Sequence, residues 1–382
     1  MERYKLGDIC EIVSGSTPKT SIEEYWDGDV KWITPAELDN DSYIITDTVR
    51  KITELAVKKS GLSSFPEGTV ILSSRAPIGK VAIAGCEMYC NQGFKNLICS
   101  EKINNKYLYW FLKGNTEFLN SLGRGATFKE ISKQIVANIE INVPDYERQM
   151  NIVKHLEKIN KIIKLRRQEL EKWDDLTRAR FIELFGHQSH NEKNMPYGKI
   201  NDVAEIYLGL THTPTYVEDG VKFISAKNTS CDYLDLSDVK YISREEFEKA
   251  PKGTKPLMGD VLFSRVGSNL GHPVILDVDE ELCTFVSLGF LRAKGQVTNV
   301  YLKHWMRDGF FAEQVAQKVV GGGQPNLNTG WLKEFKIIIP PMALQNEFAA
   351  FVAQTDKSKV AIQAALDKTQ LLFDSLMQKY FG

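Results

Sequence analysis

The chain has 382 residues, of which 43% are apolar and 25% charged, and its formal net charge is −1. This length predicts two or more domains, and the composition is typical of a globular protein. The near-neutral charge excludes a bulk attraction to nucleic acid, so any binding of phosphates would need local basic patches.

Location and metal content are constrained by a few short features. Residues 1–8 are charged and lack the apolar stretch of a secretory signal. No run approaches the roughly 20 apolar residues of a membrane span, and six scattered cysteines indicate reduced thiols. We therefore expect a cytoplasmic protein. Cys86 and Cys90 form one pair, but no second pair stands at zinc-site spacing, so no metal site is predicted.

Residues 1–144 are expected to form a β-rich module with short helices. Val70–Leu72 and Val81–Ile83 are apolar runs bounded by glycine, which is typical of strands. Glu54–Lys59 and Tyr107–Leu112 are expected to be short helices.

Residues 145–186 are predicted to form one long helix. Apolar residues recur there in alternating steps of four and three, which is the seam of a coiled coil. Arg166, Thr177 and Arg180 interrupt this seam, and Gly186 stands where a helix would end. About forty residues make a rod of roughly 60 Å, whose apolar stripe needs a partner. The seam residues are Ile152, Leu156, Ile159, Ile163, Leu170 and Trp173.

The second half of the chain repeats the first, at an offset that stays between 190 and 198 residues. An ordered series of matches through the whole chain indicates an internal duplication. The matched pairs include Gly68–Ser73 with Gly259–Ser264, Arg75 with Arg265, Gln149 with Gln345, and Phe185–Gly186 with Phe381–Gly382.

The duplication predicts a second module at residues 187–340 and a second long helix at 341–382. Val261–Phe263 and Ile337–Ile339 are its strand-like runs, and Glu245–Ala250 and Tyr301–Met306 are its expected short helices. The seam of the second helix consists of Phe348, Val352, Ile362, Leu366, Phe373 and Leu376.

Motifs of catalysis are incomplete. Gly79-Lys80 lacks both the first glycine and the hydroxyl residue of a phosphate-binding loop. Asp29-Val30-Lys31 fits half of a magnesium-dependent nuclease motif, but Gly220 replaces Asp29 in the second copy. We therefore expect a non-catalytic protein, with a metal-dependent nuclease and a protein-interaction scaffold without a DNA role as the alternatives.

The duplication favours binding to a duplex. Two unlike modules held apart by paired helices and related by a near two-fold axis suit a target whose own symmetry is two-fold. Because the modules differ in sequence, the expected target is bipartite and asymmetric, with an unread spacer.

Polar and basic loop residues are the expected DNA contacts, because such side chains reach base edges and phosphates. Each has a structural alternative: an exposed cation is usually only solvated, and the matched arginines can equally serve the fold. Aromatic residues near Phe181 and Phe373 are an alternative surface for a partner protein. The candidates are Lys19, Thr20, Arg75, Lys80, Arg124 and Lys129 in the first module, and Thr211, His212, Lys227, Asn228, Arg265, Ser268, Asn269, Gln324 and Asn326 in the second.

Three stretches carry a family resemblance. The run Gly259–Ser268 and the helix starts at Ile141–Gln149 and Ile339–Gln345 look like those of the specificity subunit of type I restriction–modification systems. Both long helices also end in Phe-Gly, as in that family. The resemblance covers the whole chain.

The resemblance implies an α+β fold with two target recognition domains, 1–144 and 187–340. It implies two spacer helices, 145–186 and 341–382, that pack as an antiparallel coiled coil with pseudo-two-fold symmetry. Each domain would read one half of a split DNA site. The implied partners are double-stranded DNA, two modification (adenine methyltransferase) subunits and restriction subunits. Those subunits would hold S-adenosylmethionine, ATP and Mg²⁺, so this chain would carry no cofactor and no catalytic residue.

Overall fold

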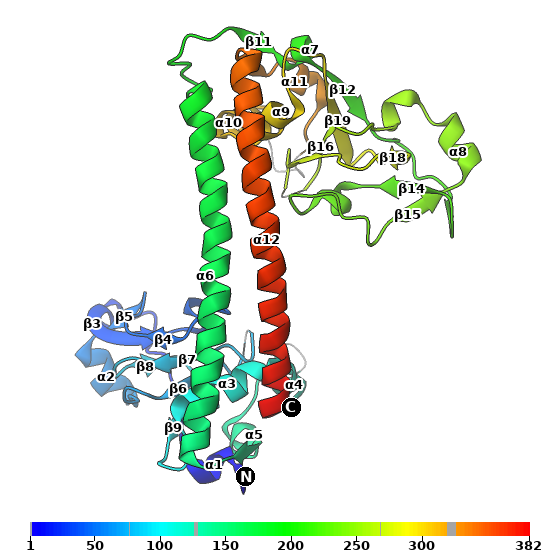
Figure 1. Cartoon of the computed structure of the whole chain (residues 1–382). Coiled ribbons are helices and arrows are strands. Elements are labelled where there is room, and N and C mark those ends of the chain that lie inside the picture. The colour runs from blue at the N-terminus through cyan, green and yellow to red at the C-terminus, as the bar shows by residue number, and fades with distance from the viewer. Residues whose placement is uncertain (1, 76, 126–128, 268, 319–325) are drawn as a thin grey trace. The chain divides into compact units, whose positions relative to one another are not determined.

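The computed structural model describes residues 2–75, 77–125, 129–267, 269–318 and 326–382, and the chain divides into two compact units (Figure 1). Unit 1 comprises residues 1–167 and 364–382, and unit 2 comprises residues 168–363. Each unit contains one globular part, which we call module 1 or module 2, and a segment of each long helix. Candidates Ser268 and Gln324 lie outside the described residues.

Module 1 precedes the first long helix, α6 (Tyr146–Phe185). Its strands are β1 (Glu2–Lys5), β2 (Cys10–Ser14), β3 (Trp26–Ile33), β4 (Ile44–Ile45), β5 (Lys51–Ile52), β6 (Val70–Leu72), β7 (Val81–Ala84), β8 (Tyr89–Cys90), β9 (Lys95–Cys99) and β10 (Glu140–Val143). Its helices are α1 (Leu6–Ile9), α2 (Glu54–Ser60), α3 (Asn105–Gly114), α4 (Thr116–Ser121) and α5 (Lys133–Ala137).

Module 2 precedes the second long helix, α12 (Met342–Phe381). Its strands are β11 (Tyr197–Lys199), β12 (Ala204–Leu208), β13 (Tyr216–Val217), β14 (Val221–Ile224), β15 (Lys240–Ile242), β16 (Val261–Ser264), β17 (Pro273–Ile275), β18 (Leu282–Thr284), β19 (Leu288–Ala293) and β20 (Lys336–Ile338). Its helices are α7 (Ile200–Val203), α8 (Arg244–Lys249), α9 (Asn299–Met306), α10 (Gly309–Ala316) and α11 (Thr329–Lys333).

The two modules share one strand topology. The main sheet has the order β2-β9-β6-β7 in module 1 and β12-β19-β16-β17 in module 2, and module 1 adds β4 at the edge. A second sheet has the order β5-β3-β8 in module 1 and β15-β14-β18 in module 2, where β13 is added beside β15. Strand β3 is parallel to β8, and β14 is parallel to β18. In each module the first and the last strand form a separate two-stranded sheet, β1-β10 in module 1 and β11-β20 in module 2. The repeat in the sequence is therefore also a repeat of topology.

Polar side chains set where the short helices begin. The side-chain oxygens of Thr53, Asn104, Ser243 and Thr298 accept hydrogen bonds from backbone N–H groups in the first turns of α2, α3, α8 and α9. Such N-caps satisfy donors that a helix start leaves free, and each contributes about 1 kcal/mol. These four helices are the ones expected from the sequence.

The core of each module lies between the main sheet and one helix. Tyr107 and Leu108 of α3 pack in the same apolar cluster as Leu97 of β9. Full burial of one such side chain stabilises a fold by roughly 1.5–3 kcal/mol. The corresponding cluster of module 2 contains Tyr301 and Leu302 of α9 together with Leu291 of β19.

A buried glutamine fixes the start of each long helix to its module. Gln149 accepts from the backbone N–H of Asn104 at 2.8 Å and donates to the carbonyls of Lys102 and Pro144. Gln345 accepts from the backbone N–H of Thr298 at 2.7 Å, and donates in the same pattern to two carbonyls. A buried amide must find such partners, so this match between the repeats serves the fold.

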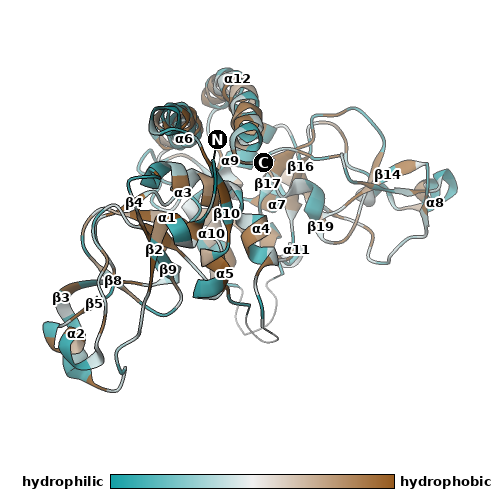
Figure 2. Ribbon diagram, turned by 90° about the horizontal axis from the view of Figure 1, so that it is seen from below, coloured by the Kyte–Doolittle hydropathy of each residue, from teal (hydrophilic) through white to brown (hydrophobic). Residues whose placement is uncertain are grey.

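In unit 1 the start of α6 and the end of α12 complete the core of module 1. Ile152 and Leu156 are buried in the same cluster against which Phe373 and Phe381 pack. Phe381 lies with its ring 5.2 Å from the ring of Tyr107 on α3. Both long helices contain hydrophobic as well as hydrophilic residues (Figure 2), as expected for helices that bury one face.

In unit 2 the end of α6 and the start of α12 pack on module 2 and run in opposite directions. Asp174 pairs with Lys359, and further along α6 Arg180 pairs with Glu347. Phe181 is buried, with its ring 5.4 Å from that of Phe348. This burial contradicts the alternative that aromatic residues near Phe181 are an exposed surface for a partner, because their area is already covered by module 2.

Candidate nucleic-acid interface

A glycine opens the loop after the first strand of each main sheet. A side chain at Gly15 would lie 2.2 Å from the carbonyl oxygen of Cys90, and one at Gly209 would lie 2.2 Å from that of Phe285. Only glycine allows the backbone to approach so closely. The loop after β2 and the loop after β12 are therefore equivalent parts of the two modules.

The loop after β2 carries Lys19 and Thr20, and both are exposed. Two indoles hold its backbone: Trp32 donates to the carbonyl of Ser16 at 3.1 Å, and Trp26 donates to that of Lys19 at 3.4 Å. These two hydrogen bonds fix the backbone of the loop, and the side chains of Lys19 and Thr20 project from it into solvent.

Arg50 is a cation beside this loop that the sequence did not single out. Its guanidinium carbon lies 4.3 Å from the ring centroid of Trp26, and its side chain is exposed. Cations stack favourably on indole faces. No periodic pattern marks such a residue, because the contact joins distant parts of the chain.

The equivalent loop of module 2 carries Thr211 and His212, which are also exposed. His212 borders an open hollow of about 420 Å³ that is also lined by Glu245 and Lys249 of α8. The same frame thus presents different side chains in the two modules.

The matching of Arg75 with Arg265 in the sequence is one residue out of register. Two backbone hydrogen bonds place Arg265 at the position of Ser74, and not at that of Arg75. These bonds are Ser74 N to Gly93 O (2.7 Å) and Ile131 N to Ser74 O (3.0 Å), against Arg265 N to Ser287 O (2.8 Å) and Leu327 N to Arg265 O (2.8 Å).

The corrected register makes Arg75 equivalent to Val266. Arg75 pairs through its backbone with Glu130, and Val266 pairs in the same way with Asn326. The physical reason for the error is the turn after β6, which is one residue shorter than the turn after β16: Gly79 N bonds Ser73 O, whereas Gly271 N bonds Ser264 O.

Arg75, Arg124 and Lys129 come together in module 1. The backbones of Arg75 and Arg124 both bridge to that of Glu130, which follows Lys129. Arg124 and Lys129 are exposed and Arg75 is half-buried. This cluster is a local basic patch of the kind that a near-neutral chain needs for contact with phosphates.

Lys80 points away from this patch. Its ammonium donates to the carbonyls of Leu38 and Pro35, the latter at 3.4 Å. These bonds tie the turn at 35–38 to the main sheet, which favours the structural role for this lysine.

Lys95 is a second cation of module 1 that the sequence did not single out. It is buried, and its ammonium lies 3.3 Å from Ser74 Oγ and 3.2 Å from a carboxylate oxygen of Glu130. Lys95 therefore ties Glu130 to the main sheet. The sequence around Lys95 does not reveal this role, because its partner Glu130 is 35 residues away in the chain.

Arg265 is buried in module 2 and serves the fold. Its guanidinium donates to the carbonyls of Val286 at 2.9 Å and Leu327 at 3.2 Å, and to the amide oxygen of Asn326 at 3.4 Å. Burial lowers the pKa of this guanidinium below its usual value. Of the two roles open from the sequence, these contacts favour the structural one.

Asn228 is likewise buried. Its amide accepts from the backbone N–H of Ser225 at 3.0 Å and donates to the carbonyls of Asp235 and Asp238. In module 1 Glu37 makes the corresponding bond to the backbone N–H of Thr34. The spacing of three residues in both copies is that of a capping box, a signal available in the sequence.

Lys227, Asn269 and Asn326 remain on the surface of module 2. Lys227 pairs with the exposed carboxylate of Asp238 at 2.9 Å, and screening by solvent makes such a pair weak. These three side chains are accessible to a polymer that approaches module 2.

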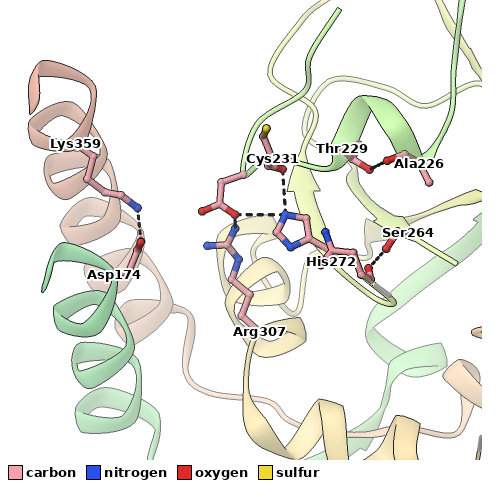
Figure 3. Close-up of polar contacts among 10 residues, drawn as sticks. Asp174, Ala226, Thr229, Cys231, Ser264, His272, Arg307 and Lys359 are labelled. Carbon is pink, nitrogen blue, oxygen red and sulfur yellow. Dashed lines mark hydrogen bonds and ion pairs between the residues drawn. The ribbon is translucent and has the colours of Figure 1, made fainter. Parts of the chain in front are cut away.

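An ion-pair network anchors the loop after Asn228, as Figure 3 shows. Asp232 joins Arg307, which follows α9, to His272 before β17, and His272 Nε2 lies 3.3 Å from its carboxylate. The same ring nitrogen lies 3.0 Å from the carbonyl of Cys231. The loop is therefore tied to the core of module 2.

Two features of the described residues bear on the alternatives. No group of three or more His, Cys, Asp or Glu side chains there could hold a metal ion. No described helix is long and apolar enough to cross a membrane. Lys31, which belongs to the incomplete nuclease motif, donates to the carbonyl of Thr46 at 2.7 Å.

Comparison with known proteins gives concordant matches. A family model described as the type I restriction modification DNA specificity domain matches residues 1–172 and 192–370. The MjaIX specificity subunit of a type I restriction enzyme of Methanocaldococcus jannaschii is 28% identical, over 98% of this chain and 91% of that protein. The HindI specificity subunit of Haemophilus influenzae is 26% identical over 38% of this chain and 32% of its own length.

Solved structures share the fold. The S subunit of a type I restriction–modification system from M. genitalium aligns with a TM-score of 0.58 and 14% identity, covering 100% of this chain and 96% of that one. A chain from a study of assembly and conformational transition of the type I system aligns with a TM-score of 0.60 and 18% identity, covering 100% and 97%.

Proposed function

The chain belongs to the family of type I restriction–modification DNA specificity subunits, and from that premise we propose how its two modules divide the reading of DNA. Module 1, within residues 1–144, and module 2, within residues 187–340, are the two target recognition domains. Each reads one half of a bipartite site.

The observation that carries this proposal is the pair of equivalent loops after β2 and β12. One strand frame presents Lys19 and Thr20 in module 1 and Thr211 and His212 in module 2. Amide, hydroxyl and basic groups distinguish base edges, so different side chains on one frame select different bases. The target is therefore asymmetric as well as bipartite.

The basic patch of Arg75, Arg124 and Lys129 supplies phosphate contacts of module 1, and the charge of Lys19 adds a further one. Phosphate contacts fix register and orientation and carry no sequence information directly. In module 2 the corresponding surface is formed by Lys227, Asn269 and Asn326, of which only the first is charged.

The long helices, residues 145–186 and 341–382, are the spacer between the two recognition domains. We propose that they pack as an antiparallel coiled coil with pseudo-two-fold symmetry. Support comes from the opposite directions of their segments in unit 2 and from seam residues that are buried or half-buried in both units. A rigid spacer would set the distance between the two half-sites.

Partner subunits provide the chemistry in this proposal. The chain contributes geometry and sequence choice and has no catalytic residue, while two adenine methyltransferase subunits and restriction subunits carry S-adenosylmethionine, ATP and Mg²⁺. Exposed apolar residues of α12, among them Val360 and Leu371, offer area for such subunits.

Adenine methylation of the host genome, mapped with and without the gene, tests the proposed function. We expect one two-part adenine motif to disappear with the gene, and an unchanged set of methylated motifs would contradict the proposal. Binding of the assembled complex to that duplex should weaken steeply with salt, because counterions are released on binding. Absence of binding to that duplex at any salt concentration would favour the scaffold without a DNA role.

A further inference from the structure

Two cysteines face each other across the main sheet of module 1. Cys10 of β2 and Cys99 of β9 are direct partners in the antiparallel register. Both belong to the apolar side of the sheet, with Cys10 buried and Cys99 half-buried. Both thiols are reduced in this structure.

The hydrogen-bond pattern shows which kind of cross-strand pair this is. The backbone N–H of Ser100 donates to the carbonyl of Ile9 at 3.0 Å, so Ile9 and Ser100 form a hydrogen-bonded pair. Because the two kinds of pair alternate along an antiparallel ladder, Cys10 and Cys99 form a non-hydrogen-bonded pair. A non-hydrogen-bonded pair brings the two Cα atoms to about 4.5 Å. Disulfides span Cα separations of about 4.4–6.8 Å, so this pair can be bridged.

The thiols also interact with each other. The hydrogen bond between them, followed by burial, raises the pKa of the Cys10 thiol. Cys99 borders an open hollow of about 290 Å³, lined also by Asn104 and Tyr146. A small oxidant can therefore reach Cys99 from solvent, while Cys10 is buried.

Module 2 provides a natural comparison. The residues at the same register positions are Ala204 and Ala293, and the backbone N–H of Lys294 donates to the carbonyl of Val203 at 2.8 Å. The strand pair therefore folds with two methyl groups at this point. The thiols of module 1 are not needed to form the sheet.

We propose that Cys10 and Cys99 are a redox-modification site, which peroxide converts to a cross-strand disulfide. The Cys99 thiol attacks the O–O bond of hydrogen peroxide, giving a sulfenic acid and one water. The Cys10 thiol then displaces the sulfenic hydroxyl as a second water, and the S–S bond forms. Two thiols lose two electrons and two protons, and the peroxide is reduced to water.

The bridge would join two functional parts of module 1. β2 leads directly to the loop with Lys19 and Thr20, and β9 leads through Lys102 to the contacts that fix Gln149 at the start of α6. A covalent link also reduces the freedom of the unfolded chain, which stabilises the module. Since cytosolic thiols are normally kept reduced, the bridge forms on oxidation and is reversed by a dithiol reductant.

Peptide mapping of the full-length chain after exposure to hydrogen peroxide tests the site. Remaining thiols are alkylated, the chain is digested without reduction, and the peptides are identified by mass spectrometry. We expect a linked peptide pair containing Cys10 and Cys99 that is lost on treatment with dithiothreitol. We also expect a higher midpoint of thermal unfolding for the oxidised chain than for the reduced chain.

The matched control is the double variant Cys10→Ala and Cys99→Ala, which reproduces the alanine pair of module 2. Its unfolding midpoint should not respond to peroxide. In Cys10→Ala alone, the sulfenic acid on Cys99 should be trapped by the cyclic dione dimedone. The exposed Cys231 is an internal standard, because its oxidation shows that the oxidant was active.

Two results would overturn the proposal. One is oxidation of Cys231 with no linked Cys10–Cys99 peptide in the unmodified chain. The other is conversion of Cys99 to sulfinic or sulfonic acid at the same rate in the unmodified chain and in Cys10→Ala, since a resolving partner must protect it.

Discussion

Modules 1 and 2 each bury a cation at the same point of the main sheet, but the cation stands at different positions of the chain. Module 1 uses Lys95 of β9, which reaches Ser74 and Glu130. Module 2 uses Arg265, at the position of Ser74, which reaches Val286, Leu327 and Asn326. The position of Lys95 is occupied in module 2 by Gly289.

Packing explains why β19 of module 2 does not carry the cation. A side chain at Gly289 would lie 2.5 Å from the ring of Phe263, so no lysine fits there. The two sites also differ in charge, because Lys95 pairs with a carboxylate whereas Arg265 bonds carbonyl and amide oxygens. The planar fork of an arginine suits several neutral acceptors, and a lysine is a point charge. The comparison shows that the duplication preserved a location of charge and not a residue.

Removal of the module 2 cation should have the largest effect. Arg265→Ala leaves buried carbonyls without a donor, and we expect a loss of about 3 kcal/mol in the stability of unit 2. Native-state hydrogen exchange would show reduced protection in unit 2 only. Arg244→Ala, at an exposed arginine of the same module, is the control and should change stability by less than about 0.5 kcal/mol. Equal effects of the two variants would refute the structural role.

The second largest expected effect is a loss of stability in acid that affects unit 2 and not unit 1. His304 packs against Phe348, where Trp110 of module 1 packs against Phe373. Burial, assisted by Arg307, lowers the pKa of His304 to about 3. Since the folded pKa lies below the unfolded value of about 6.5, the unfolded chain takes up the proton more readily. Stability from this group is therefore complete above about pH 6.5 and is lost as the pH falls towards 3.

We expect unit 2 to lose about 2 kcal/mol between pH 7 and pH 5 through His304. The measurement is denaturant unfolding at several pH values, compared with His304→Gln, which cannot titrate. The difference in pH dependence between the two chains isolates the imidazole from the nearby carboxylates. A parallel pair of stability profiles would show that His304 contributes nothing.

The ion pair of module 1 should contribute less than the arginine of module 2. Glu130 is partly exposed, so solvent screens its attraction to Lys95. A double-mutant cycle of Lys95→Met and Glu130→Gln should give a coupling of about 1 kcal/mol. A coupling energy larger than the stability lost in Arg265→Ala would show that the ion pair of module 1 contributes more than the arginine of module 2.

The equivalent DNA-facing loops should differ in salt dependence. Lys19→Ala in the assembled complex should lower the slope of log affinity against log salt by about 0.9, because one phosphate contact is lost. Thr211→Ala removes no charge and should leave the slope unchanged while it alters discrimination between bases. Equal slopes for both variants would place Lys19 away from the phosphates.

The sequence predicted features that repeat along the chain. The duplication, the two long helices and the strands around Val70 and Val261 follow from periodicity and from matched runs, and the structure has them. The pair Gln149 and Gln345 was matched correctly because both follow the same helix start.

Side-chain direction was not predictable in the same way. Lys80, Asn228 and Arg265 were proposed as DNA contacts because polar and basic side chains on loops can reach base edges and phosphates. All three instead bond carbonyl groups of their own module. Such contacts join residues distant in the sequence, and a turn shorter by one residue hid the true partner of Arg265.

Exchange of one module tests the central claim most directly. Residues 187–340 would be replaced by the corresponding part of another specificity subunit, with module 1 and both long helices kept, and genomic adenine methylation would be mapped. We predict that one half of the bipartite motif changes, while the other half and the spacer length are retained. A motif that stays the same, or one in which both halves change together, would contradict the division of the reading between two modules.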